Sequence, residues 1–177
     1  IFTYLNYCRS EANASSNIPK SEIDALHALY NATDGENWSW PTDPNRPGIK
    51  FPWQRGVPWN FTADANPCAD NWYGIKCTNS TPNFVEFIIL PAQNLSGTLP
   101  NAIGFFPSLQ KLEFRHNPNL TGTIPDVFGN LTRLQGLDMS HNSLNGTLPP
   151  SLLATAATLC GAAELPQIIL PKHRLQS

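Results

Sequence analysis

The chain is poor in charge. Lys, Arg, Asp and Glu supply 14% of its 177 residues, against about a quarter in an ordinary soluble domain. Its net charge is −2 and its pI is near 6.1, so it lacks the basic balance that nucleic acid or an anionic membrane surface attracts. Solubility must then depend on something other than charge, and covalently attached sugar is one source.

Long hydrophobic runs are also missing. The longest apolar-rich run, 84–90, contains Glu86 and is far shorter than the roughly 20 residues of a membrane span, so membrane insertion is not expected. The chain begins with Ile1 rather than Met, which makes a removed signal peptide an expectation. The sequence leaves open whether an anchor or a kinase follows Ser177. A hydrophobic content of 41% in 19.5 kDa predicts one domain with a real core.

Cysteine is scarce, and its spacing excludes the usual zinc sites. The four cysteines are Cys8, Cys68, Cys77 and Cys160. They form no Cys-x-x-Cys pair and have no paired histidines nearby, as a zinc site would require. An even number in an exported chain favours two disulfides instead. No cofactor is expected.

One feature is present in excess: the sequence contains more Asn-x-Ser/Thr triplets with no Pro in the middle than chance predicts. With 18 Asn and 25 Ser plus Thr in the chain, chance predicts about two to three such triplets. The sequence contains nine, which predicts a secreted, extracellular and N-glycosylated protein, since glycans are transferred to chains entering the secretory pathway. The triplets start at Asn13, Asn31, Asn37, Asn60, Asn79, Asn94, Asn119, Asn130 and Asn145.

The second half of the chain repeats itself. Similar segments start at residues 85, 109 and 134, so the periods are 24 and 25 residues. They follow the pattern L-x-x-L-x-L-x-x-N-x-L, with one extra residue in the second repeat, and the repeat unit of this pattern is 20–29 residues long. The pattern predicts a short parallel strand in each repeat, with an apolar trio pointing into the core. These trios are Val85, Ile88, Leu90; Leu109, Leu112, Phe114; and Leu134, Leu137, Met139.

An amide follows each predicted strand. Asn117 and Asn142 occupy the inward Asn position and Gln93 stands there in the first repeat, where a side-chain amide can bond backbone groups that would otherwise be buried unpaired. The next leucines, Leu95, Leu120 and Leu144, are expected to re-enter the core.

The Gly-x-Leu/Ile-Pro element that closes each repeat resembles the plant-type leucine-rich repeat subclass, found in plant receptor ectodomains and in secreted proteins of plants and protists. The resemblance covers about residues 21–158. It implies an α/β fold, a short right-handed solenoid with a parallel β-sheet on its concave face and a helical, disulfide-bonded N-terminal cap. Residues 68–77 resemble the cysteine motif of that cap, which implies a Cys68–Cys77 bond and a Trp72 packed over the open end of the first repeat.

The sequence therefore divides into an N-terminal arm (1–20), a cap with a Trp- and Pro-rich loop (21–84), three repeats (85–158) and an atypical C-terminal segment (159–177). Ser21 is predicted to cap an amphipathic helix that ends at about Ala32. No C-terminal cap is recognisable. Cys8 and Cys160 are a possible pair, within one chain or between chains.

A binding surface is predicted where the strands face outward and where the cap loop carries aromatic residues. None of these positions lies in a glycosylation triplet. His116 and His141 are expected about one strand spacing apart, but no third ligand is in register, so surface histidines are favoured over a metal site. Trp40, Trp53 and Trp59 suit either a carbohydrate-stacking or protein interface or the packing of the loop itself. The candidates are Phe87, Ile89, Lys111, Glu113, Arg115, His116, Asp138, His141, Trp40, Trp53 and Trp59.

No catalytic constellation is present in the sequence, and a non-catalytic module that binds an extracellular protein, peptide or glycan is the favoured function. Three strands make a face of only a few hundred Å², less than the roughly 800 Å² of a standard interface, so a partner must also contact the cap loop, a flank or a solenoid end. Two alternatives remain: a structural subunit that assembles head to tail into an extracellular filament or matrix, and an inhibitor of secreted glycan hydrolases, which the resemblance alone suggests.

Overall fold

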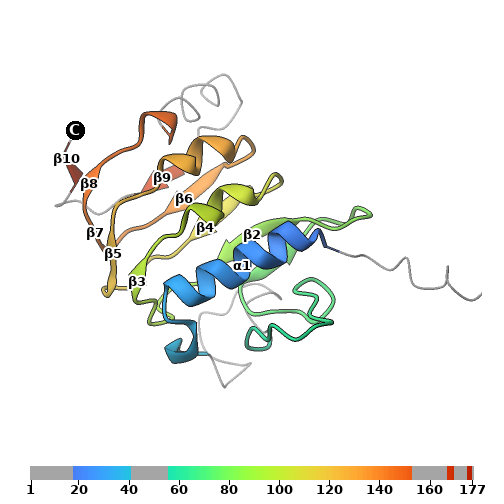
Figure 1. Ribbon diagram of the computed structural model, residues 1–177. Helices are drawn as coiled ribbons and strands as arrows, with labels where there is room; N and C mark the ends of the chain where they lie inside the picture. The colour runs from blue at the N-terminus through green and yellow to red at the C-terminus, as the bar shows by residue number, and fades with distance from the viewer. Residues whose placement is uncertain (1–17, 41–55, 153–166, 170–174, 177) are drawn as a thin grey trace, which may run out of the picture.

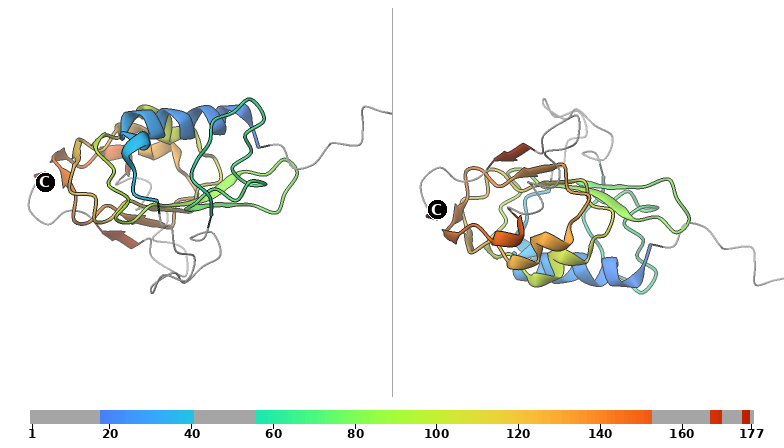
Figure 2. Two further views of the ribbon diagram at one scale, coloured as in Figure 1. Left: turned by 90° about the horizontal axis from the view of Figure 1, so that it is seen from below. Right: turned by 90° about the horizontal axis from the view of Figure 1, so that it is seen from above.

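The computed structural model describes residues 18–40, 56–152, 167–169 and 175–176. Within this part, helices line one side of an elongated core and strands line the other (Figures 1 and 2). The elements in chain order are α1 (Lys20–Ala32), η1 (Gly35–Asn37), β1 (Ile75–Cys77), β2 (Val85–Ile89), β3 (Gly97–Thr98), η3 (Asn101–Phe105), β4 (Lys111–Glu113), β5 (Leu120–Gly122), η4 (Asp126–Asn130), β6 (Gly136–Asp138), β7 (Ser143–Leu144), β8 (Gly146–Thr147), β9 (Gln167–Ile169) and β10 (Leu175–Gln176).

The strands form one main sheet in the order β1-β2-β4-β6-β9. β1 runs antiparallel to β2, and the other neighbours are parallel. The predicted repeat strands are thus confirmed as β2, β4 and β6. All nine residues of the predicted apolar trios are buried, at no more than 3% exposure. A smaller parallel sheet, β3-β5-β7, follows the turns after these strands.

The helical side consists of α1 and the short helices η3 and η4, which lie one after another along the solenoid (Figure 1). α1 begins at Lys20, and the N-terminal cap position is Pro19. The prediction that Ser21 caps this helix is wrong. The backbone carbonyl of Pro19 accepts from the N–H groups of Glu22 and Ile23, so the helix is capped two residues before Ser21, and Ser21 lies in its first turn.

The predicted inward amides form a ladder beneath the sheet. Asn117 is fully buried, and its Nδ2 donates to the carbonyl oxygens of Leu90 (3.0 Å) and Phe114 (2.6 Å). Its Oδ1 accepts from the N–H groups of Gln93 (2.9 Å) and Leu95 (3.0 Å). One side chain therefore satisfies four backbone groups of two adjacent repeats, where no regular strand could pair them.

Aromatic packing builds the N-terminal cap. Trp72 is 1% exposed, and the resemblance is confirmed in placing it inside the cap. The ring centroids of Trp59 lie 5.6 Å from Trp72 and 5.0 Å from Trp38. The indole N–H of Trp59 donates to the carbonyl of Tyr73, and that of Trp38 to the carbonyl of Thr33, both at 2.8 Å. Each buried indole therefore keeps a polar partner.

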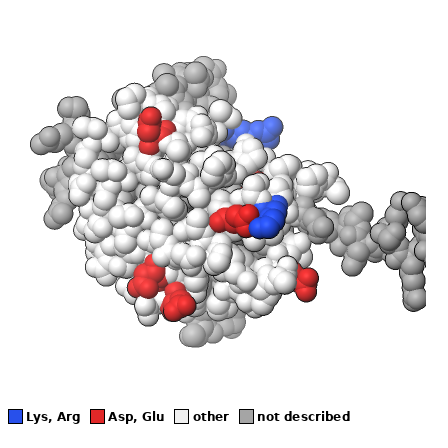
Figure 3. Space-filling view, viewed as in Figure 1, with Lys and Arg blue, Asp and Glu red and all other residues white. Residues whose placement is uncertain are grey.

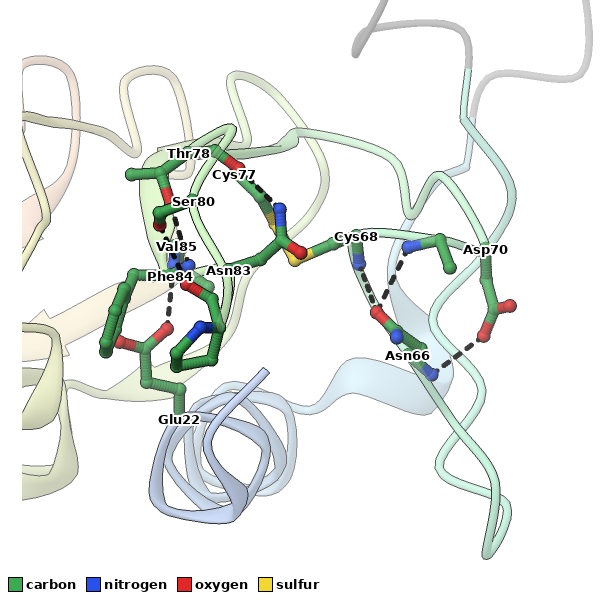
Figure 4. Close-up of a disulfide and its surroundings, with 12 residues drawn as sticks. Glu22, Asn66, Cys68, Asp70, Cys77, Thr78, Ser80, Asn83, Phe84 and Val85 are labelled. Atoms are coloured by element: carbon green, nitrogen blue, oxygen red, sulfur yellow. Dashed lines mark hydrogen bonds between the residues drawn. A yellow bond between two sulfur atoms is a disulfide. The ribbon is translucent and has the colours of Figure 1, made fainter. Parts of the chain in front are cut away.

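The Cys68–Cys77 disulfide is present, with a Cα–Cα distance of 5.7 Å, and links the loop before β1 to the end of that strand (Figure 4). Around it, the Oδ1 of Asn66 accepts from the N–H groups of Cys68 and Ala69. The disulfide thus pins an irregular segment to the edge of the main sheet. Cys8 and Cys160 lie outside the described residues.

Replacing both bonded cysteines with serine should lower the free energy of unfolding by about 2–3 kcal/mol. The bridge closes a loop with a sequence separation of 9, and the chain-entropy model assigns a stabilisation of this order to such a loop. Urea unfolding of the Cys68→Ser/Cys77→Ser variant, with Cys8 and Cys160 intact, measures the change. A loss below about 1 kcal/mol would show that hydrogen bonds such as those of Asn66 hold the segment without the bridge.

The C-terminal segment adds strands that the sequence did not predict. β9 pairs in parallel with β6, with Ile168 opposite Leu137, and β10 pairs with β8. The main sheet thereby gains a strand at the place where the repeat pattern stops. The edge of β6, after which no cap was recognisable in the sequence, is paired with β9.

Candidate functional site

The outward positions of the repeat strands form one surface, which we call the concave strand face: Phe87, Lys111, Glu113, Arg115 and Asp138. The strand register sets Phe87 beside Lys111 and Glu113 beside Asp138. Adjacent strands are about 4.8 Å apart, so residues 24 or 25 positions apart in sequence are direct neighbours here. These residues therefore lie on neighbouring strands of one face, and their role in binding stays a prediction.

Charges on the concave strand face are paired. The Nζ of Lys111 lies 2.6 Å from the Oε1 of Glu113, and the Nε of Arg115 lies 4.0 Å from the Oδ2 of Asp138. Asp138 also accepts from the N–H (3.0 Å) and hydroxyl (2.6 Å) groups of Ser140. The carboxylates are thus held by cations and hydrogen bonds, which suits a mixed-charge recognition surface better than acid–base chemistry.

At the cap end of the concave strand face, the ammonium group of Lys76 covers the ring of Phe87. The Nζ of Lys76 lies 4.2 Å from the ring centroid of Phe87 and 2.6 Å from the Oε2 of Glu86. The amide of Gln110 donates to the Oε1 of Glu86 at 2.9 Å. Phe87 is consequently half-buried, with the ammonium group of Lys76 over its ring.

Two of the predicted surface residues are not accessible. Ile89 is 3% exposed and Trp59 is 5% exposed, so the prediction that either contributes to a binding surface is wrong. Trp59 belongs to the packed aromatic core of the cap. Trp40 is half-buried, with its ring centroid 5.4 Å from that of Trp38. Trp53 lies outside the described residues.

His116 and His141 stack on each other at the end of the strand face. Their ring centroids are 4.2 Å apart and their planes differ by 6°. Both side chains are exposed, and both residues have positive φ, 61° and 58°. Among the residues that the structure describes, no group of three or more His, Cys, Asp and Glu is placed to hold a metal ion. The pair is therefore a surface feature of equivalent repeat positions.

The described asparagines of the glycosylation triplets are accessible at the surface. All eight triplet asparagines in the described ranges have exposed side chains, whereas Asn117, which starts no triplet, is fully buried; Asn13 lies outside these ranges. Asn37 and Asn94 meet on one flank, where the Nδ2 of Asn94 donates to the carbonyl of Asn37 at 3.0 Å. The eight exposed triplet asparagines are Asn31, Asn37, Asn60, Asn79, Asn94, Asn119, Asn130 and Asn145.

Sequence reasoning missed one buried acid, Glu22. Its Oε2 accepts from the N–H of Val85 at 2.7 Å, which joins the first turn of α1 to the start of β2 (Figure 4). Glu22 is fully buried. Burial raises the pKa of its carboxyl to about 7, against the opposing effect of the Val85 hydrogen bond. The signal was available, because Glu22, Leu26 and Leu29 share one helical stripe.

The stacked parallel strands, buried leucines and asparagine ladder define a leucine-rich repeat solenoid. The Leucine Rich Repeat family model matches residues 108–131 and 133–154. The match covers the second and third repeats, and the chain is similar to the plant leucine-rich repeat proteins described next.

A similar curated protein is a probable leucine-rich repeat receptor-like serine/threonine-protein kinase of Arabidopsis thaliana. It is 30% identical over 109 residues, which is 61% of this chain and 10% of the relative. This chain thus spans about a tenth of that receptor-like kinase. Within the described part of the chain, no helix has both the length and the apolar character needed to cross a membrane.

Two solved structures are similar over most of the chain. The structure of PEPR1 with AtPEP1 matches with a TM-score of 0.65 and 28% identity, covering 90% of this chain and 19% of that one. A plant ice-binding protein matches with a TM-score of 0.53 and 23% identity, covering 89% of this chain and 50% of that one. The second likeness shows the fold alone.

Proposed function

We propose that the chain is an exported, N-glycosylated and non-catalytic interaction module that binds an extracellular protein or peptide at the concave strand face. The observation that carries this proposal is that the glycosylation triplets and the concave strand face occupy different parts of the surface. Every triplet asparagine in the described ranges is exposed, while none of the five residues of the concave strand face lies in a triplet. Sugars would thus cover the flank and the helical side and leave the strands accessible.

The similar proteins support a recognition role. One is a receptor-like kinase by name, and PEPR1 is solved together with AtPEP1. β9 also favours a discrete module over a head-to-tail filament, because it ends the main sheet with a strand of only 3 residues, and very short edge strands limit pairing with another chain. A main sheet of five strands is about 19 Å wide at the usual strand spacing, so it offers more contact area than three strands do.

Arg115 gives the sharpest test of the concave strand face. Its side chain is 46% exposed and its Nε is 4.0 Å from Asp138, so it can bond a partner without a costly desolvation. The glycosylated chain would be immobilised and screened against secreted proteins, peptides and oligosaccharides. For the partner found, Arg115→Ala should weaken the Kd about tenfold, which is ~1.4 kcal/mol.

The matched control is Arg133→Ala, because Arg133 is an exposed arginine in the turn before β6. It should leave the Kd unchanged. Equal affinities of the parent, Arg115→Ala and Arg133→Ala proteins for the partner would exclude the concave strand face as the binding site. If the partner found is an oligosaccharide, the ligand is a glycan rather than a protein or peptide. If the native chain forms concentration-dependent polymers on sizing columns, the head-to-tail filament is favoured instead.

A further inference from the structure

Phe105 is the most exposed large hydrophobic side chain in the described ranges, at 62%. It is the last residue of η3, on the helical side of the solenoid, and its neighbour Phe106 is fully buried. One ring of this pair thus belongs to the core and the other projects into solvent. A phenyl ring held out on a short, well-packed helix is a surface that a partner group can cover.

Asn130 occupies in η4 the position that Phe105 occupies in η3. Each is the fifth and last residue of its helix and follows a glycine, Gly104 in η3 and Gly129 in η4. The two helices lie side by side along the solenoid (Figure 1). Asn130 is exposed and starts the triplet Asn-Leu-Thr, so a glycosylation site stands beside the exposed ring.

Gly104 shows in which direction the Asn130 side chain points. A Cβ built on Gly104 would lie 3.3 Å from the Nδ2 of Asn130 and 2.9 Å from the Cβ of Val127. The amide nitrogen therefore reaches back over η3 and rests above the residue that directly precedes Phe105. Nδ2 is the atom to which an N-linked glycan is attached, so the first sugar must start over η3.

We infer that the first N-acetylglucosamine of a glycan on Asn130 packs against the ring of Phe105. The inference rests on the proposed glycoprotein nature of the chain. In the transfer, the amide nitrogen displaces the pyrophosphate of a lipid-linked oligosaccharide and loses one proton. It keeps one N–H, and the new Nδ2–C1 bond fixes the sugar above Gly104.

The chemistry of both groups favours this contact. A pyranose ring has a face of C–H groups, and the face of a phenyl ring carries partial negative charge that attracts such groups. Their contact removes apolar area of Phe105 from water. Neither group is charged, and the helical side carries few charged side chains, scattered over a mostly uncharged surface (Figure 3). The sugar thus stabilises the fold and hides its most exposed phenyl ring.

The test is a double-mutant cycle on the full chain made in a secretory host. Thr132→Ala destroys the triplet but leaves Asn130 in place, and Phe105→Ser removes the ring. In the presence of Phe105, Thr132→Ala should lower the Tm by about 2–4 °C, the shift that ~1 kcal/mol produces in a chain of this size. In the Phe105→Ser background it should have no effect.

A control and a second measurement separate this contact from a general effect of sugar. Thr147→Ala, which destroys the Asn145 triplet on β8, should change the Tm by the same amount whether or not Phe105 is present. In proton spectra, the ring of Phe105 should shift signals of the first sugar on Asn130 upfield, and Phe105→Ser should abolish that shift. Trimming every glycan to a single N-acetylglucosamine should preserve the shift.

Peptide mapping identifies which proposal fails. An unmodified Asn130 beside other occupied triplets would overturn the contact and leave the proposed function standing. A modified Asn130 with additive Tm changes and no upfield shift would also overturn the contact alone. A chain that leaves the secretory host with no triplet modified would remove the proposed glycoprotein as well.

Discussion

Replacing Asn117 with alanine should lower the free energy of unfolding by about 4 kcal/mol or more. The side chain accepts from the N–H groups of Gln93 and Leu95 and donates to the carbonyls of Leu90 and Phe114. Alanine leaves these four backbone groups buried without partners, and each such group costs about 1–3 kcal/mol. Urea unfolding measures the total, and hydrogen exchange should show faster exchange at the Gln93 and Leu95 amides.

Asn142→Ala is the matched control, since Asn142 holds the same place in the next repeat. Its Oδ1 accepts from the N–H of Asn117 at 2.8 Å, and its buried Nδ2 has no hydrogen-bond partner among the described residues. One lost hydrogen bond should cost about 1 kcal/mol. If Asn117→Ala does not fold, Asn117→Asp keeps the acceptor and loses the donor, and it should still be less stable than Asn142→Ala. Equal losses at 117 and 142 would contradict the ladder.

The role of Asn117 was predictable because an amide recurs at its position in each repeat. A residue that returns after a buried strand in consecutive repeats must serve the same backbone turn each time, and the same logic correctly assigned the apolar trios and Leu95, Leu120 and Leu144, which are fully buried. The cap motif likewise gave the Cys68–Cys77 bond. Sequence spacing is therefore sufficient to predict a residue's role wherever that residue packs against the equivalent residue of the neighbouring repeat.

Prediction failed where a contact has no equivalent in the repeat. Strand alternation places Ile89 outward but cannot say whether another segment covers it, and Ile89 is in fact only 3% exposed. Trp59 enters the cap core through rings from segments far apart in sequence. β9 pairs with β6 across about 30 residues, a distance at which no short motif specifies register.

Glu22 is the other position where a single change should have a large effect, and the effect depends on pH. Its folded pKa is about 7, above the usual 4.5, because burial disfavours the charge. A carboxyl with a raised pKa stabilises the fold fully below pH 4.5, and this stabilisation is lost as the pH rises through about 7. The difference between about 7 and 4.5 corresponds to roughly 3 kcal/mol, at 1.36 kcal/mol per pKa unit. The chain should therefore be more stable in mildly acidic than in alkaline surroundings, as far as this group is concerned.

Glu22→Gln isolates that contribution, because glutamine is neutral at every pH and its Oε1 can still accept from the N–H of Val85. The difference in unfolding free energy between the two proteins should be small near pH 4.5 and should move by roughly 3 kcal/mol in favour of the variant by pH 8. Denaturant unfolding at several pH values measures it. The exposed Glu36 in η1 supplies the control, since Glu36→Gln should give parallel curves. A constant difference between Glu22→Gln and the parent would mean that the helix moves away from β2 and lets water reach the carboxylate.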